Sequence, residues 1–327
     1  MDSEFTAAIP ENALHDPFAT LDVDIDAFEQ VLEALPFRIQ EACLDHLDDL
    51  QEIRLIYGYP LVFNQGGKMK KRDEIRIEKR DVQHVRDKIG GFRSDWRAGI
   101  DGTLHRFSGV PNRYESLVGV VIRLARAIYG IAEPLRPYLE GDGSIMLVGS
   151  PGTGKTSLLR DVVRVIADSK GQSCVAVDTS NEIGGDGDRP HPILGDALRV
   201  QVGSPTRQGE ILRMVIANLT PEVLVVDEIG YHGNDVQHVE TCSRRGVKVI
   251  STLHGEILRD VVHNPSFWPL VGNVRLEERR RVTDPVFKMA LELHGKGQWV
   301  LYPNLQEAVD SVLLDKEPEG LKLGAWT

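Results

Sequence analysis

Residues 149–156 read Gly-Ser-Pro-Gly-Thr-Gly-Lys-Thr, between a short apolar stretch at 144–148 and a segment with helical spacing at 157–167. The eight residues fit the pattern Gly-x4-Gly-Lys-[Ser/Thr], and a strand before it and a helix after it are the context that the pattern requires. Glycines let the backbone wrap so that successive N–H groups point at phosphate oxygens, and the helix adds the partial positive charge of its N-terminus. The stretch therefore predicts a phosphate-binding loop.

Each part of this loop has a predicted role. Lys155 would reach the β- and γ-phosphates of ATP, and the Thr156 hydroxyl would be a Mg²⁺ ligand. The predicted nucleotide contacts are the whole loop and the next residue: Gly149, Ser150, Pro151, Gly152, Thr153, Gly154, Lys155, Thr156 and Ser157. ATP and Mg²⁺ are thus the expected cofactors.

A second apolar strand ends in two acids: Val223-Leu-Val-Val-Asp227-Glu228. Asp227 would hold Mg²⁺ through water, and Glu228 would polarise the water that attacks the γ-phosphate. An Asp-Glu pair suits hydrolysis better than nucleotide storage. The residues alone therefore predict an Mg-ATP-binding and ATP-hydrolysing enzyme.

Two further strands are predicted to end in polar residues. Thr252 and His254 follow the strand at 247–252 and are candidate sensors of the γ-phosphate. Glu182 follows the strand at 173–178, which we expect beside the phosphate-loop strand, and is a second candidate for the water-activating residue. The choice between Glu228 and Glu182 stays open. The glycine- and proline-rich stretch 184–195 predicts a loop near the site.

The fold class is predicted as α/β, because apolar strands alternate with helices at 157–167 and 211–219 and so favour a parallel sheet with ligands at its carboxyl edge. The chain beyond Asp284 predicts a final helix around Val286–Leu293, a strand at 299–302 and a helix at 305–314. The five predicted strands of the sheet are 144–148, 173–178, 198–202, 223–227 and 247–252.

The N-terminal half predicts a smaller α+β domain. Helical spacing begins at Phe28 and is interrupted by Pro36, and strands are expected at 51–57 and 117–124. Residues 68–97 hold eleven Lys/Arg against six Asp/Glu, which predicts a solvated face, with contact to nucleic acid or an acidic partner as the alternative. The predicted domains are an acidic flexible tail (1–27), an N-terminal α+β domain (28–130) and an ATPase domain with a C-terminal extension (131–327).

Composition narrows the class of protein further. Of 327 residues, 41% are hydrophobic and 27% charged, an ordinary globular balance. Thirteen Asp/Glu and one basic residue in the first 50 account for most of the net charge of −11 and argue against an N-terminal nucleic-acid arm or a basic transit peptide. We expect no signal peptide and no membrane-spanning segment. Three widely spaced cysteines predict reduced thiols and a cytoplasmic location, and no metal besides Mg²⁺ is expected.

These motifs resemble the stage III sporulation protein AA family and its cyanobacterial and plastid relatives, which are similar to the type II and type IV secretion and pilus-motor ATPases. The resemblance covers roughly residues 28–310. It implies a RecA-like P-loop core, ATP hydrolysis and a hexameric ring. Its carriers are 149–156, 178–184, 221–230 and 251–255 in the core, and 50–60, 102–108 and 120–124 upstream.

The resemblance also assigns residues. His254 stands in the place of the histidine box of the secretion ATPases, and 178–182 in that of their aspartate box, where only Asp178 and Glu182 remain as acids. Arginines of the upstream region reach a neighbouring subunit's nucleotide in those ATPases, which makes Arg106, Arg113 and Arg123 candidate fingers here. The larger cyanobacterial relatives carry a C-terminal domain for single-stranded nucleic acid, and we expect none in this sequence.

Three functions follow as hypotheses. The first is a hexameric ring motor that acts on an unidentified protein partner. The second is a DNA or RNA motor with a positive channel from 68–80, Arg244 and Arg245. The third is an ATP-dependent scaffold or switch with little turnover.

Overall fold

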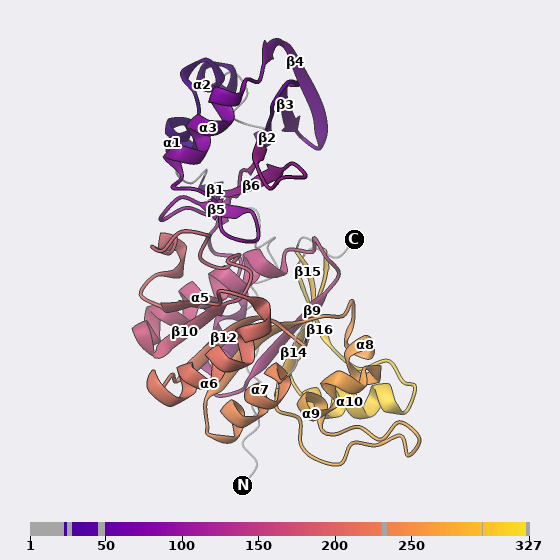
Figure 1. Cartoon of the computed structure of the whole chain (residues 1–327). Helices are drawn as coiled ribbons and strands as arrows, with labels where there is room; N and C mark the ends of the chain where they lie inside the picture. The colour runs from indigo at the N-terminus through magenta and orange to yellow at the C-terminus, as the bar shows by residue number, and fades with distance from the viewer. Residues whose placement is uncertain (1–22, 25–27, 45–49, 231–233, 296, 325–327) are drawn as a thin grey trace. The chain divides into compact units, whose positions relative to one another are not determined.

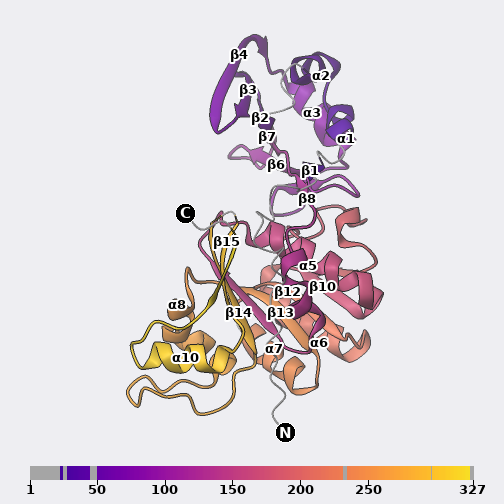
Figure 2. The same ribbon diagram turned by 180° about the vertical axis from the view of Figure 1, so that it is seen from behind.

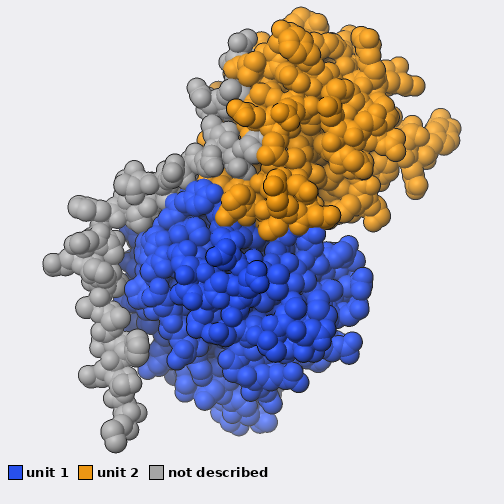
Figure 3. All heavy atoms as spheres, turned by 90° about the vertical axis from the view of Figure 1, so that its left-hand side faces the viewer, with its two compact units in different colours: residues 1–22, 128–183, 193–327 blue, residues 23–127, 184–192 orange. Residues whose placement is uncertain are grey.

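The computed structural model describes residues 23–24, 28–44, 50–230, 234–295 and 297–324. Most of the predicted acidic tail therefore lies outside the described residues. The described chain forms two compact units, coloured separately in Figure 3. Unit 1 holds residues 128–183 and 193–327, and unit 2 holds 23–127 together with 184–192. The predicted domain limits remain a prediction, and each unit is described by itself.

Unit 1 is built on an eight-stranded sheet with the order β11-β10-β12-β13-β9-β14-β15-β16 (Figure 1). The pairs from β11 to β14 are parallel, and β15 and β16 continue the sheet antiparallel. Its strands are β9 (Ile145–Gly149), β10 (Cys174–Asp178), β11 (Leu198–Gln201), β12 (Val223–Ile229), β13 (Lys248–Leu253), β14 (Met289–Gly295), β15 (Gln298–Tyr302) and β16 (Leu321–Gly324). The predicted α/β fold with a RecA-like P-loop core is confirmed.

Helices cover both faces of this sheet (Figures 1 and 2). Helix α5 packs against β9, β10, β12 and β13. Helices α6, α7, α8, α9 and α10 share one buried core with side chains of the opposite strand face, such as Met146 and Val148, and α4 packs against α5. The helices of unit 1 are α4 (Arg136–Glu140), α5 (Lys155–Lys170), α6 (Gln208–Asn218), α7 (Asp235–Arg244), α8 (Leu258–His263), α9 (Trp268–Val271) and α10 (Leu305–Leu313).

Two predictions about this sheet are wrong. Residues 289–295 form strand β14 rather than a helix, because an apolar run this short fits either period and here pairs in parallel with β9. Strand β10 does not neighbour β9, since β12 and β13 lie between them. The phosphate-loop strand is therefore flanked by β13 and β14, and Glu182 must approach the site from further away in the sheet.

Unit 2 is a six-stranded antiparallel sheet with the order β4-β3-β2-β7-β6-β5. Three helices pack on one face around a core that includes Ile53, Phe63 and Ile122, and the chain breaks between the first two at Pro36, as predicted. Two short strands, β1 (Val23–Asp24) and β8 (Ala127–Ile128), form a separate sheet. The remaining elements are α1 (Phe28–Ala34), α2 (Phe37–Leu44), α3 (Lys79–Lys88), β2 (Leu50–Ile56), β3 (Pro60–Gln65), β4 (Lys68–Arg76), β5 (Arg97–Gly99), β6 (Arg106–Pro111) and β7 (Leu117–Arg123).

In the described part of the chain, no helix combines the length and the apolar character needed to cross a bilayer. Cys43, Cys174 and Cys242 are buried and free.

Candidate active site

The phosphate loop runs from the end of β9 to the start of α5 and depends on glycine at three points. A Cβ on Gly149 would lie 2.6 Å from the carbonyl oxygen of Leu293 on β14. Gly152 and Gly154 have φ values of 84° and 96°, in the left-handed region that other residues rarely adopt. The loop conformation therefore explains the glycines of the sequence motif.

Lys155 is turned into this loop. Its ammonium group donates to the carbonyl oxygens of Gly149 and Ser150, at 3.1 Å to the latter. Burial lowers the pKa of Lys155, while the nearby charges of Glu228 and Asp227 raise it. The half-buried ammonium group and the surrounding loop N–H groups form a cradle for phosphate oxygens.

Asp227, at the end of β12, is the most strongly perturbed acid of the site. Its side chain is 3% exposed, and its Oδ1 accepts a hydrogen bond of 3.2 Å from the Thr252 hydroxyl on β13. Among the described residues nothing donates to its Oδ2. Burial, together with the charges of three other carboxylates, raises the pKa of Asp227 to about 8. A buried carboxylate with an unpartnered oxygen is a group that a bound cation would stabilise.

The backbone of β12 makes an irregular local turn at Glu228, one residue after Asp227 and before the pairing resumes at Ile229. The φ of Glu228 is +50°, rare for a residue with a Cβ, and the pairing of β12 with β13 shifts between Val226 and Ile229. The Glu228 N–H donates to the Thr252 hydroxyl at 2.8 Å. Thr252 thus links Asp227, the predicted metal ligand, to Glu228, the predicted catalytic residue. The Glu228 side chain is exposed while both neighbours are buried.

Glu182 also reaches the site, although β10 is not beside β9. Its Oε2 lies 3.4 Å from the Thr156 hydroxyl, which donates to it, and Arg160 donates to its backbone carbonyl at 2.8 Å. Asp178 is fully buried, accepts from the Ile183 N–H at 3.1 Å and lies 4.0 Å from Arg199. The structure therefore brings residues from three strand ends to the phosphate loop: Glu182, Asp227, Glu228 and Thr252.

These oxygens fit a magnesium ion better than a metal held mainly by protein. No group of three or more His, Cys, Asp or Glu side chains in the described ranges is arranged to hold a metal ion. Mg²⁺ takes one or two protein oxygens and completes its shell with water and substrate phosphates. The Thr156 hydroxyl and the Asp227 carboxylate are oxygen groups of this kind, and their role as Mg²⁺ ligands stays a prediction.

His254 and Ser157 are two further predicted nucleotide contacts. His254 is exposed in the turn after β13, and the next residue, Gly255, accepts a hydrogen bond of 3.0 Å from the Gly149 N–H. This bond ties the turn to the phosphate loop. Ser157 lies in the first turn of α5. Their nucleotide contacts remain predictions.

The three candidate finger arginines lie in unit 2, and their environments differ. Arg106 on β6 is 15% exposed and pairs with Asp186 at 3.3 Å. Arg123 on β7 is 67% exposed and lies 3.4 Å from Glu52. Arg113 stacks over the Tyr114 ring at 4.9 Å. Their roles stay predictions, and Arg106 is the most enclosed of the three.

Sequence reasoning missed where residues 184–192 go. They belong to unit 2, where the Asp186 side chain is 2% exposed and pairs with Arg93 at 2.7 Å as well as with Arg106. A Cβ on Gly185 would lie 2.0 Å from the carbonyl oxygen of Thr103, and one on Gly99 would lie 2.5 Å from the Asp186 Cβ. The glycines that predicted a loop near the site are thus explained by close packing in unit 2.

Gln208 was also missed. This buried side chain at the start of α6 donates to the backbone carbonyls of Asp227 and Glu228. A lone glutamine before a helical pattern gave no signal, because only the tertiary structure brings α6 to the end of β12.

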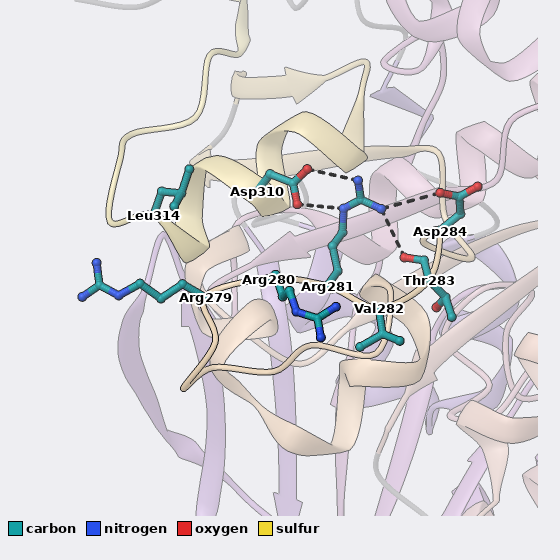
Figure 4. A pocket seen from close by; sticks show the side chains of 8 residues that line it. All are labelled: Arg279, Arg280, Arg281, Val282, Thr283, Asp284, Asp310 and Leu314. Atoms are coloured by element: carbon teal, nitrogen blue, oxygen red, sulfur yellow. Dashed lines mark hydrogen bonds and ion pairs between the residues drawn. The ribbon is translucent and has the colours of Figure 1, made fainter.

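A cavity of about 610 Å³ lies elsewhere in unit 1, between the 279–284 loop and α10 (Figure 4). Arg281 crosses it and pairs with Asp310 through two contacts of 2.8 and 3.0 Å. The other two arginines of its lining are also paired, Arg279 with Asp315 and Arg280 with Glu278. No predicted site residue lines the cavity. It is therefore a poorer candidate than the phosphate loop.

Comparisons with known proteins agree with this geometry. The family model "Sporulation stage III, protein AA" matches residues 97–286. The chain is 34% identical over 310 residues to the uncharacterized protein ycf45 of Porphyra purpurea, covering 90% of this chain and 55% of that protein. It is 34% identical over 182 residues to stage III sporulation protein AA of Bacillus subtilis, covering 54% and 58%. The chain thus spans little more than half the length of these relatives.

The fold also has a solved counterpart. The pilus retraction motor PilT, solved with bound ADP, superposes with a TM-score of 0.58 over 85% of each chain at 16% identity. At this identity the match shows a shared fold.

Proposed function

The chain belongs to the stage III sporulation protein AA family, and from this premise we propose that it is a Mg²⁺-dependent ATPase that works as a hexameric ring on a protein partner, in the cytoplasm. The observation that carries the proposal is the set of carboxylates gathered at the strand ends beside Lys155. Burial and the charges of Glu228, Asp178 and Glu182 raise the pKa of Asp227 there. Such perturbed groups cluster at functional sites.

The residues divide the proposed reaction among them. Lys155 and the loop N–H groups would bind the β- and γ-phosphates, and Thr156 with Asp227 would hold the metal. When bound, Mg²⁺ would neutralise phosphate charge and orient the γ-phosphate. Glu228 would accept the proton of the attacking water, because its side chain is exposed at the strand end.

Glu182 is better suited to the metal side of the site. Its carboxylate already accepts from the Thr156 hydroxyl at 3.4 Å. Thr156 is a proposed metal ligand, so Glu182 would orient it and the water around the ion. This favours Glu228 as the water-activating residue.

The ring completes the site in this proposal. An arginine from a neighbouring subunit would stabilise charge in the transition state and make turnover depend on assembly. Arg123 suits this role best of the three candidates, since its side chain is 67% exposed and its contact with Glu52 is a long one of 3.4 Å. The structural relation to a pilus motor supports mechanical work as the output.

A nucleic-acid motor is the second candidate, favoured by β4. This edge strand carries Lys68, Lys70, Lys71 and Arg72, and the three lysines are exposed. Lysines on an edge strand also prevent edge-to-edge aggregation, so the observation has a structural explanation as well. The third candidate is an ATP-bound scaffold or switch.

The deciding experiment measures ATP turnover and molar mass by light scattering, with and without ATP, single-stranded and double-stranded nucleic acid. Glu228→Gln is the impaired variant, and Glu307→Gln, an exposed glutamate on α10, is the control. We expect turnover that depends on a larger assembly, does not respond to nucleic acid and falls to a small, measurable residual rate only in Glu228→Gln. Strong stimulation by DNA or RNA would support the second candidate. ATP binding without turnover in any state would overturn the proposed enzyme and support the switch.

A further inference from the structure

We propose that Gln208 is a positioning residue for Glu228: its side-chain amide holds the backbone turn at which the Glu228 carboxylate is exposed. The inference rests on the proposed ATPase function and deepens it.

The geometry is a clamp on two consecutive peptide groups. Gln208 is the first residue of α6, after the short 3-10 helix Pro205–Arg207, and it is 0% exposed. Its Nε2 donates to the carbonyl oxygen of Asp227 at 3.3 Å and to that of Glu228 at 3.2 Å. One side chain therefore satisfies the carbonyls on both sides of the Glu228 backbone.

The turn needs such support. Glu228 has a φ of +50°, where its Cβ is crowded, and a residue in this conformation relaxes unless its surroundings hold it. Two side chains do so from opposite sides. Thr252 accepts from the Glu228 N–H at 2.8 Å, and Gln208 donates to the carbonyls. With both in place, the Glu228 side chain is exposed between the buried Asp227 and Ile229.

A purely structural role explains Gln208 poorly. Its Oε1 is buried without a hydrogen-bond partner in the described part of the chain. An apolar residue would fill this core position without a buried, unpartnered Oε1 and would lose only the two bonds to Asp227 and Glu228. The two bonds that the amide does make both go to the turn at Glu228. The position of a general base must be held closely, since a small displacement costs much in rate.

The first test replaces the donor and keeps the bulk. Gln208→Met preserves the length of the side chain and removes both hydrogen bonds. We expect kcat to fall on the order of tenfold to a hundredfold while the KM for ATP and the affinity for ADP change less than about twofold. Gln208→Asn retains the amide on a shorter chain and should fall between. Gln237→Met, at an exposed position on α7, is the control and should match the parent. An unchanged kcat in Gln208→Met would overturn the inference.

A double-mutant cycle separates positioning from any other role. If Gln208 acts only through Glu228, Gln208→Met lowers turnover in the parent but adds no loss in a Glu228→Gln background. Equal losses in both backgrounds would show that Gln208 acts elsewhere and would overturn the inference.

A readout without turnover keeps the inference separate from the proposed function. Hydrogen exchange at the Glu228 N–H reports the turn directly, since this N–H is bonded to Thr252. We expect faster exchange in Gln208→Met and Gln208→Asn, and no change in Gln237→Met. If the parent protein hydrolyses no ATP but exchange responds in this way, the function fails and the clamp stands. If exchange is unchanged, the clamp fails whatever the turnover.

Discussion

The buried carboxylates of the two units have opposite electrostatic surroundings. In unit 2, Asp81 pairs with Arg38, and Asp186 pairs with Arg93 and Arg106. At the strand ends of unit 1, the charges that act most on Asp227 belong to Glu228, Asp178 and Glu182, and all three raise its pKa. Away from those ends unit 1 resembles unit 2, because Asp161 on α5 pairs with Arg164 at 2.6 Å.

The difference separates scaffold from site. A buried carboxylate beside an arginine is stable as it stands, whereas neighbouring carboxylates repel one another until a cation or a proton intervenes. Natural proteins tolerate such local cost where a ligand relieves it. The comparison therefore predicts that the same kind of mutation has opposite effects in the two places.

The largest effect is expected for an arginine of unit 2 that we propose to act in catalysis rather than in the scaffold. Arg123→Ala should lower turnover by about 10³-fold, as expected for an arginine finger. It should change the free energy of unfolding by less than about 1 kcal/mol, because Arg123 is itself 67% exposed and the buried Glu52 keeps its closer pair with Arg54 at 2.6 Å. Turnover and urea unfolding measure the two effects. Full activity in Arg123→Ala would move the role to Arg113 or Arg106, and full activity in all three single variants would exclude a finger from this set.

The next effect tests the site directly. Asp227→Asn should lower turnover by about 10²- to 10³-fold, because the proposed metal ligand loses its charge. Without nucleotide or metal the same variant should melt a few degrees higher, since folding at neutral pH requires this carboxyl, with its pKa raised to about 8, to take up a proton, and an amide has no such requirement. Scanning calorimetry at neutral pH measures this. A lower melting temperature would show that Asp227 is already compensated.

A smaller effect of opposite sign is expected for an acid of unit 2. Asp186→Asn leaves Arg93 and Arg106 without their shared carboxylate and should cost about 2 kcal/mol, less than for a fully buried pair because both arginines keep some exposure. Asp188→Asn, an exposed neighbour in the same loop, is the control. Urea unfolding followed by a probe in unit 2 should separate the two variants, and equal midpoints would contradict the scaffold role.

The smallest effect concerns a buried cation of unit 1 that is held by carbonyls. Lys248 donates to the backbone oxygens of Tyr138, Leu139 and Gly141, and burial lowers its pKa to about 8. Between pH 8 and the ordinary pKa of lysine, Lys248 is protonated in the unfolded state but has lost its proton in the folded state. The free energy of unfolding therefore rises with pH over this range. From pH 8 to pH 9 the gain should be about 1 kcal/mol relative to Lys248→Met. Parallel unfolding curves across this range would contradict it.

Much of the fold was predictable because its signals are local. The phosphate loop, the apolar strand before Asp227 and the break at Pro36 each follow from a few adjacent residues. The helix predicted around Val286–Leu293 was wrong because the pattern of adjacent residues there does not distinguish a helix from a strand. Five of the seven residues of β14 are buried in a run, and both a helix and a central strand can produce that pattern.

The residues of the candidate site were likewise predictable where they lie in a local motif. Sequence motifs contain four of these residues, and the spacing within each motif predicts the role of the residue: Lys155, Thr156, Asp227 and Glu228. Glu182 was identified although its expected strand neighbour was wrong, because carboxyl ends of parallel strands share one edge of the sheet whatever their order. Asp186 gave no such signal, since its partners Arg93 and Arg106 lie 93 and 80 residues away.

The sequence by itself determined the phosphate loop, the acidic strand end and the α/β class, since each depends on residues that touch within one turn or one strand. Only the tertiary structure decided that β14 flanks the phosphate-loop strand, that residues 184–192 pack into unit 2 and that Gln208 reaches the Glu228 turn. Those outcomes depend on which distant segments share a core, and burial and hydrogen bonding are satisfied over the whole fold rather than within a segment.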